Sequence, residues 1–117
     1  MPSIRELVGA IGQRDGVDAA VVLGRDGLVI DSSAPATMDA ERLAAHIPSI
    51  LTGADDLGNS AMRGPMTMAV IEQPGGVAIV CGLSSEAVLL VLAKPSSDLA
   101  SLLYELRRNR EQMAALV

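Results

Sequence analysis

Three stretches of this chain, residues 19–23, 77–83 and 87–93, consist almost entirely of apolar residues. A strand with one face in water alternates apolar and polar side chains, whereas a strand covered on both faces is apolar throughout. Connections as short as residues 74–76 and 84–86 suit antiparallel hairpins. The chain is therefore expected to build a largely antiparallel sheet that is covered on both faces.

Two further β-rich segments complete a five-stranded sheet. One follows the Gly24-Arg25-Asp26-Gly27 turn, and the other precedes Pro74-Gly75-Gly76. Both turns carry the Gly, Asp and Pro residues that tight hairpin connections need. The strands are predicted at residues 17–23, 28–30, 66–72, 77–83 and 87–93.

Three other segments have helical periodicity. Residues 3–14 open with Ser3-Ile4-Arg5-Glu6, a capping box in which Ser and Glu satisfy free backbone amides. Residues 39–58 form the second helix, and the third begins at Leu99, after the capping candidates Ser96, Ser97 and Asp98. The result is a single domain over residues 1–117, an α/β fold of α+β type with the order α-β-β-α-β-β-β-α.

Pro48 lies inside the second predicted helix, where it removes a hydrogen bond to the carbonyl of Ala44. It also disfavours helical geometry at Ile47, the residue before it. The apolar stripe continues in phase across Pro48, which favours one kinked helix over two separate ones.

Three helices do not suffice to cover both faces of such a sheet. Five strands span about 24 Å at a spacing of about 4.8 Å, and a helix with its side chains is about 10 Å across. With two helices on one face and one on the other, the second face should be about half bare. A symmetric homodimer is the commonest way to supply the missing cover. The alternative is a smaller or more twisted sheet that one long helix covers.

The composition excludes several classes of ligand. The chain contains no Phe, no Trp and a single tyrosine, Tyr104, so stacking platforms for bases or sugars are absent. Its net charge of -5 argues against binding to a nucleic-acid backbone. One cysteine, Cys81, fits a reducing compartment. Neither a signal peptide nor a membrane span is recognisable, so we expect a cytoplasmic protein with no membrane insertion.

No catalytic or cofactor-binding constellation emerges, and we expect a protein that is not an enzyme and has no cofactor. His46, the single histidine, and Cys81 are too few for a zinc site. The adjacent Asp55 and Asp56 point in different directions on a helix and are interpreted as solvated charges. The cluster of Arg107, Arg108 and Arg110 suits either an arginine finger for phosphoryl transfer or charges that complement a helix C-terminus.

The order of elements, together with particular residues, resembles the Roadblock/LC7 family. The features that carry the resemblance are Gly16-Val17 at the first strand, Val21-Val22-Leu23 before Arg25-Asp26-Gly27-Leu28-Val29-Ile30, Glu41-Arg42-Leu43-Ala44-Ala45 in the second helix, Met68-Ala69-Val70-Ile71-Glu72, and the final helix Leu99 to Arg108. The resemblance covers essentially the whole chain and is greatest to short prokaryotic members of the MglB type.

This resemblance implies a homodimer and a protein partner. The second helix and the third strand should form the dimer interface, through Leu43, Ile47, Ile50, Leu51, Ala54, Met66, Met68 and Val70. Met62, Met66 and Met68 fit either an interface or the core. Family members act as scaffolds or regulators of small Ras-like GTPases and as adaptor subunits, so we expect a homodimeric signalling module that modulates the nucleotide cycle of such a GTPase. The alternatives are a structural adaptor without effect on GTP hydrolysis and a small-ligand sensor.

Overall fold

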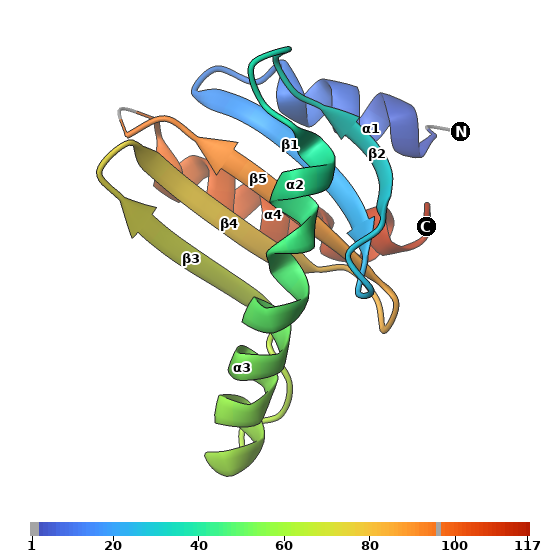
Figure 1. Ribbon diagram of the computed structural model, residues 1–117, viewed down its shortest axis with the longest axis vertical. Helices are drawn as coiled ribbons and strands as arrows, with labels where there is room; N and C mark the ends of the chain where they lie inside the picture. Colours follow the sequence, from blue (N-terminus) through green and yellow to red (C-terminus); the bar gives the residue numbers. More distant parts are fainter. Residues whose placement is uncertain (1–2, 96) are drawn as a thin grey trace.

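A five-stranded antiparallel sheet organises the computed structural model, which describes residues 3–95 and 97–117. Its strands lie in the spatial order β2-β1-β5-β4-β3, so β2 and β3 form the two edges (Figure 1). The bounds are β1 Val17–Gly24, β2 Val29–Ser33, β3 Met68–Gln73, β4 Gly76–Gly82 and β5 Ala87–Ala93. The predicted five-stranded antiparallel sheet is confirmed, with β3 beginning two residues later than expected.

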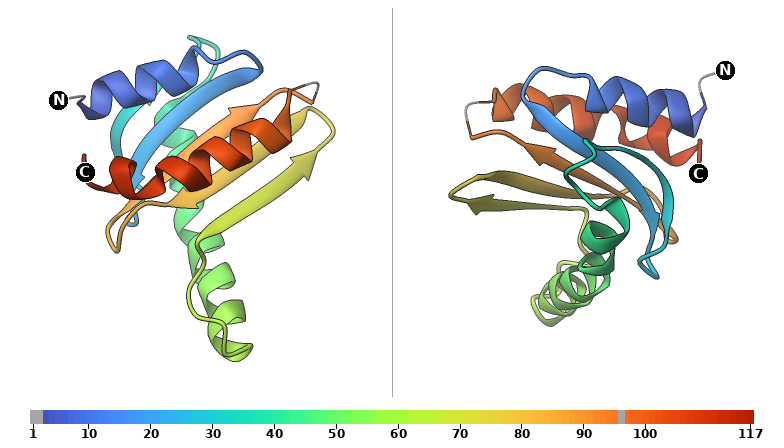
Figure 2. Two further views of the ribbon diagram at one scale, coloured as in Figure 1. Left: turned by 180° about the vertical axis from the view of Figure 1, so that it is seen from behind. Right: turned by 45° about the horizontal axis from the view of Figure 1, so that its top comes forward.

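The helices lie on the two faces of the sheet, as the two views of Figure 2 show. Helices α1 and α4 pack on one face, and α2 and α3 pack on the other. Their bounds are α1 Ile4–Gly12, α2 Ala40–Ala45, α3 Ile47–Ser60 and α4 Leu99–Ala114. Ser3 caps α1 by accepting from the Glu6 amide at 3.2 Å, and Asp98 caps α4. Of the three expected capping residues of α4, Ser96 lies outside the described residues.

The single kinked helix expected over residues 39–58 is instead two helices. His46 ends α2 and precedes α3, and Pro48 lies in the first turn of α3. A proline is tolerated in a first turn because the amide that it lacks would have no intrahelical partner there. Pro48 therefore starts a new helix rather than bending an existing one.

The uninterrupted apolar strands form two cores, one on each face. Along β1, Ala20 and Val22 belong to the core under α1 and α4, whereas Val21 and Leu23 belong to the core under α2 and α3. Most of β1 and β5 and the second half of β4 are buried on both faces. On the α2–α3 side, however, Ile71, Ala78 and Leu92, which are neighbours across β3, β4 and β5, are only half-buried, so part of this face is open, as expected. The bend at His46 gives that face two helix segments, and these bury its central side chains.

Candidate interaction surface

Strand β3 is an edge strand with a free backbone edge and partly exposed side chains. It pairs regularly with β4 over all six of its residues. Met68 packs into the core under α1 and α4, and Ala69 packs into the opposite core. Because side chains alternate along a strand, Val70 and Glu72 lie on the α4 side. Val70 is 40% exposed, so this edge offers both hydrogen-bonding groups and apolar surface to another strand.

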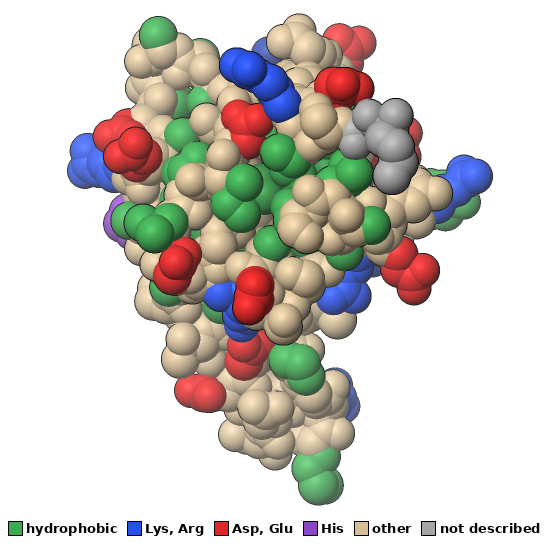
Figure 3. Space-filling view, turned by 90° about the vertical axis from the view of Figure 1, so that its right-hand side faces the viewer, with side chains coloured by type: hydrophobic (Ala, Val, Ile, Leu, Met, Phe, Trp, Pro, Cys, Tyr) green, Lys and Arg blue, Asp and Glu red, His purple; other side chains and the backbone are tan. Residues whose placement is uncertain are grey.

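The opposite edge, β2, is less suited to pairing. It has five residues, and its register with β1 shifts between Val22 and Leu23. The Asp31 carboxylate accepts a hydrogen bond from the Ser32 amide at 2.8 Å, so that amide already has a partner. Figure 3 shows this side of the molecule, where hydrophobic side chains gather among acidic and basic ones. Short, irregular and charged edges resist strand addition, so β3 is the more open of the two edges.

The C-terminal part of α3 and the loop after it project beyond the sheet as an arm, residues 53–66 (Figures 1 and 3). Leu57 and Met62 are exposed on it, Met62 to 94%. Met62 also has a φ of 58°, a left-handed conformation that is uncommon for a residue other than glycine. The arm returns close to the helix, since the Arg63 amide donates to the Gly58 carbonyl at 2.7 Å. The arm is therefore a hydrogen-bonded projection that exposes apolar side chains to solvent.

Asp55 joins the arm to the β1–β2 turn and links its two ends. Its carboxylate accepts from the Arg25 guanidinium at 2.5 Å and from the Met66 amide at 2.7 Å. The sequence-based interpretation of Asp55 as a solvated charge is therefore wrong, whereas Asp56 is exposed as expected. No pattern in the sequence could have found this contact, because Arg25 and Asp55 are 30 residues apart.

Replacement of Asp55 by alanine should lower the free energy of unfolding by about 1–2 kcal/mol, since it removes two charge-assisted hydrogen bonds from a half-buried site. Asp56→Ala, at the exposed neighbouring position, should change stability by less than about 0.5 kcal/mol. Chemical denaturation of the two variants side by side measures the difference. Equal effects would show that the Asp55 contacts add nothing.

The eight residues predicted for a dimer interface do not form one surface. Ile47 and Leu51 are buried in the core under α2 and α3, where Leu43, Ile50 and Met66 also pack in part. Met68 and Val70 lie on the opposite face of the sheet, and Ala54 is half-buried on α3. The structure thus brings Met68 and Val70 together at the β3 edge. Ile47 and Leu51 are occupied by contacts within the chain, whereas Leu57 of the arm, which is not among the eight residues, is exposed.

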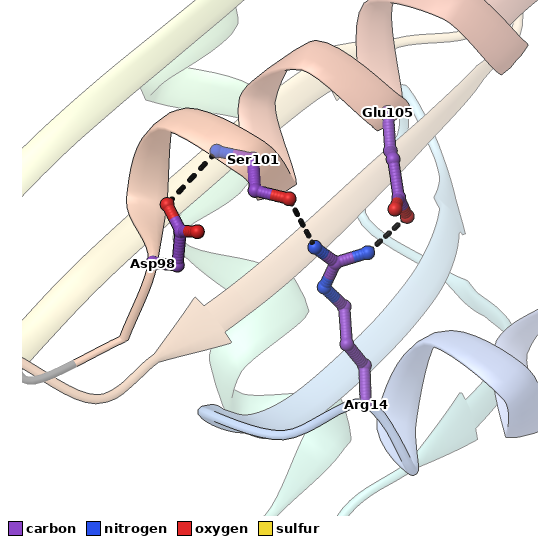
Figure 4. A network of polar contacts seen from close by, with 4 residues as sticks. All are labelled: Arg14, Asp98, Ser101 and Glu105. Carbon is purple, nitrogen blue, oxygen red and sulfur yellow. Dashed lines mark hydrogen bonds and ion pairs between the residues drawn. The ribbon is translucent and has the colours of Figure 1, made fainter.

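A groove of about 610 Å³ lies between α1 and α4. Leu7, Ile11, Leu102 and Met113 are among its apolar lining residues. Arg14, in the turn after α1, pairs with Glu105 of α4 and donates to the Ser101 hydroxyl at 3.0 Å (Figure 4). The Ser101 amide in turn donates to Asp98 at 3.2 Å. This network holds α1 against α4 at one end of the groove.

The side chains considered for catalysis do not assemble into a reactive site. His46 is exposed, and burial raises the pKa of the Cys81 thiol, while the nearby Arg110 charge offsets part of that rise. Arg110 donates to the Gly82 carbonyl at 2.5 Å, whereas Arg107 and Arg108 are exposed. Within residues 3–95 and 97–117, no group of His, Cys, Asp and Glu side chains is placed to hold a metal ion. No helix in these ranges is long and apolar enough to cross a membrane.

Comparison with known proteins agrees with this geometry. MglB from Myxococcus xanthus has a TM-score of 0.88 at 12% identity, over 97% of this chain and 93% of that one. A Roadblock/LC7 domain from Streptomyces avermitilis has a TM-score of 0.74 at 27% identity, over 95% and 94%. An uncharacterised protein from Methanocaldococcus jannaschii is 26% identical over 91% of this chain and 92% of its own length. The model of the Roadblock/LC7 domain matches residues 4–93, so this chain belongs to the Roadblock/LC7 family.

Proposed function

We propose that this protein is a cytoplasmic homodimer that binds a small Ras-like GTPase and modulates its nucleotide cycle. The observation that carries the proposal is the Roadblock/LC7 match over residues 4–93. Family membership supports a regulatory or scaffold role rather than an enzymatic one. The similarity in fold to MglB supports the same assignment.

The homodimer is proposed to form through the β3 edge. Two antiparallel β3 strands would join the sheets of two copies into one, since this edge is regular and β2 is partly blocked. The projecting arm, with Leu57 and Met62, would pack beneath the second copy and bury apolar surface that is in solvent in one chain. Of the sequence-predicted residues, Met66, Met68 and Val70 are the members of this interface closest to the seam.

The GTPase is proposed to contact a surface that the dimer presents. With two copies joined, the arms and the β3 strands of both form a continuous surface on the α2–α3 side of the sheet, larger than one chain offers. The exposed Arg107 and Arg108 lie on α4, on the opposite side. Under this arrangement the protein acts by positioning elements of the GTPase rather than by supplying an arginine to the phosphate.

A GTPase assay tests the proposal directly. Adding the protein to its cognate small GTPase should change the rate of GTP hydrolysis about tenfold or more. The protein should also bind one nucleotide form of the GTPase, GTP-bound or GDP-bound, more tightly than the other. Single-turnover hydrolysis and pull-down against both nucleotide forms give the two readouts. Arg107→Ala with Arg108→Ala should leave the rate change intact, because a finger role is not proposed.

Two results would point elsewhere. Binding to the GTPase without any change in hydrolysis would identify a structural adaptor. Indifference to every cognate GTPase in both nucleotide forms would refute the GTPase assignment, while the oligomeric state, measured separately by sedimentation, would still test the homodimer.

A further inference from the structure

Arg110 and Glu72 each have a charge that no residue of opposite sign neutralises within the described chain. The ion pairs there join Arg14 to Glu105 and Arg25 to Asp55. Arg110 uses one N–H to reach the Gly82 carbonyl, and a guanidinium has five such donors. Glu72 is the single charged residue of β3. A half-buried arginine with spare donors and an unpaired carboxylate thus lie along the same edge of the molecule.

The guanidinium of Arg110 lies beside the start of β3. A Cβ atom placed on Gly82 would be 3.6 Å from the carbonyl oxygens of Met66 and Thr67 and 3.9 Å from the Arg110 Nη2 atom. Glu72 of the same chain lies five residues farther along, about 17 Å at the rise of a β-strand. The two charges of one chain are therefore too far apart to pair.

Antiparallel pairing of two β3 strands brings these charges together across the seam. For a two-fold axis that crosses β3 between residues 69 and 70, Glu72 of one copy lies opposite residues 66–68 of the other, near Arg110. The two side chains also lie on the same face of the sheet. Glu72 is on the α4 side of the sheet, the side from which Arg110 extends, and a two-fold axis perpendicular to the sheet keeps that side common to both copies.

We propose that Arg110 of each copy forms an ion pair with Glu72 of the second copy, one pair at each end of the β3–β3 seam. This inference rests on the proposed homodimer and goes beyond it by naming the charges that select the second copy and fix the register of the strands. Paired charges at an interface set partner choice, and like charges placed opposite each other penalise a wrong partner.

Charge reversal with mixing provides the test. Arg110→Glu and Glu72→Arg, each alone, place like charges at both ends of the seam and should weaken the homodimer about tenfold or more. An equimolar mixture of the two variants forms a heterodimer with opposite charges at both ends, so its affinity should return close to that of the wild type. Analytical ultracentrifugation at low salt measures the three affinities, and circular dichroism confirms that each variant is folded.

The control is a charge reversal at a neighbouring position of α4, Arg108. Arg108→Glu reverses the same charge on the same helix at an exposed position. Because it keeps Arg110 and Glu72, it should dimerise by itself like the wild type, and its heterodimer with Glu72→Arg, which has one like-charge pair, should be weaker than the heterodimer of Arg110→Glu and Glu72→Arg. A mixture of Arg110→Glu and Glu72→Arg that binds no more tightly than either variant alone would overturn the ion pair, as would folded single variants that dimerise like the wild type. A wild-type chain that stays monomeric would instead refute the proposed homodimer.

Discussion

Val70→Lys should convert the protein from a dimer to a monomer at micromolar concentration, weakening self-association about a hundredfold. Val70 lies in the middle of the β3 edge and is 40% exposed in one chain. In the proposed dimer the two lysines would lie near the two-fold axis, where each ammonium loses water and meets a like charge. A hundredfold change corresponds to about 2.7 kcal/mol, a modest cost for two charges at such a seam.

The other edge of the sheet supplies a matched control. Ile30 on β2 is 52% exposed, and Ile30→Lys makes the same kind of change on an edge strand that is not proposed to pair. Sedimentation velocity over a dilution series should show a dimer for Ile30→Lys and a monomer for Val70→Lys, and circular dichroism should show that both variants are folded. A dimer that survives Val70→Lys but not Ile30→Lys would place the interface at β2 instead.

The two-faced sheet could be predicted from the sequence because its signal is local. In β1 and β5 nearly every residue is apolar, and no position has to be matched with a distant one to infer burial on both faces. Helix starts are equally local, which is why the capping role of Ser3 was predicted correctly.

The contacts that shape the interaction surface are not local and could not be predicted. Arg14 and Glu105 are 91 residues apart, and Arg25 and Asp55 are separated by the whole of β2 and α2. A charged residue in the sequence gives no sign of whether it will meet a partner after folding. Asp55 and Asp56 illustrate this, since one fixes the arm and the other is in solvent.

The helical stripe of Ile47 and Leu51 shows a different limit. Apolar spacing predicts that one side of a helix is buried but not which sheet or subunit buries it. These two side chains pack under β1, β4 and β5 of their own chain. Leu57, three residues after Ala54 on the same helix, lies on the arm beyond the sheet and is exposed. The position of the sheet edge therefore determines which apolar residues of the helix remain exposed and free to contact a partner. That position depends on the whole fold and not on the local sequence.

Leu89→Ala should be the most destabilising of the substitutions considered, lowering the free energy of unfolding by about 2–5 kcal/mol. Leu89 has no exposed surface and lies on β5, the central strand, with β1 on one side and β4 on the other. Leu89 belongs to the core under α1 and α4, where close-packed side chains around it can relax only in part, so its loss leaves a cavity. Leu28→Ala, at an exposed position in the β1–β2 turn, should cost less than about 0.5 kcal/mol. Thermal unfolding at one fixed protein concentration should show a melting temperature about 10–20 °C lower for Leu89→Ala than for the wild type. A loss of stability no larger than that of Leu28→Ala would mean that the core can collapse around the deleted side chain.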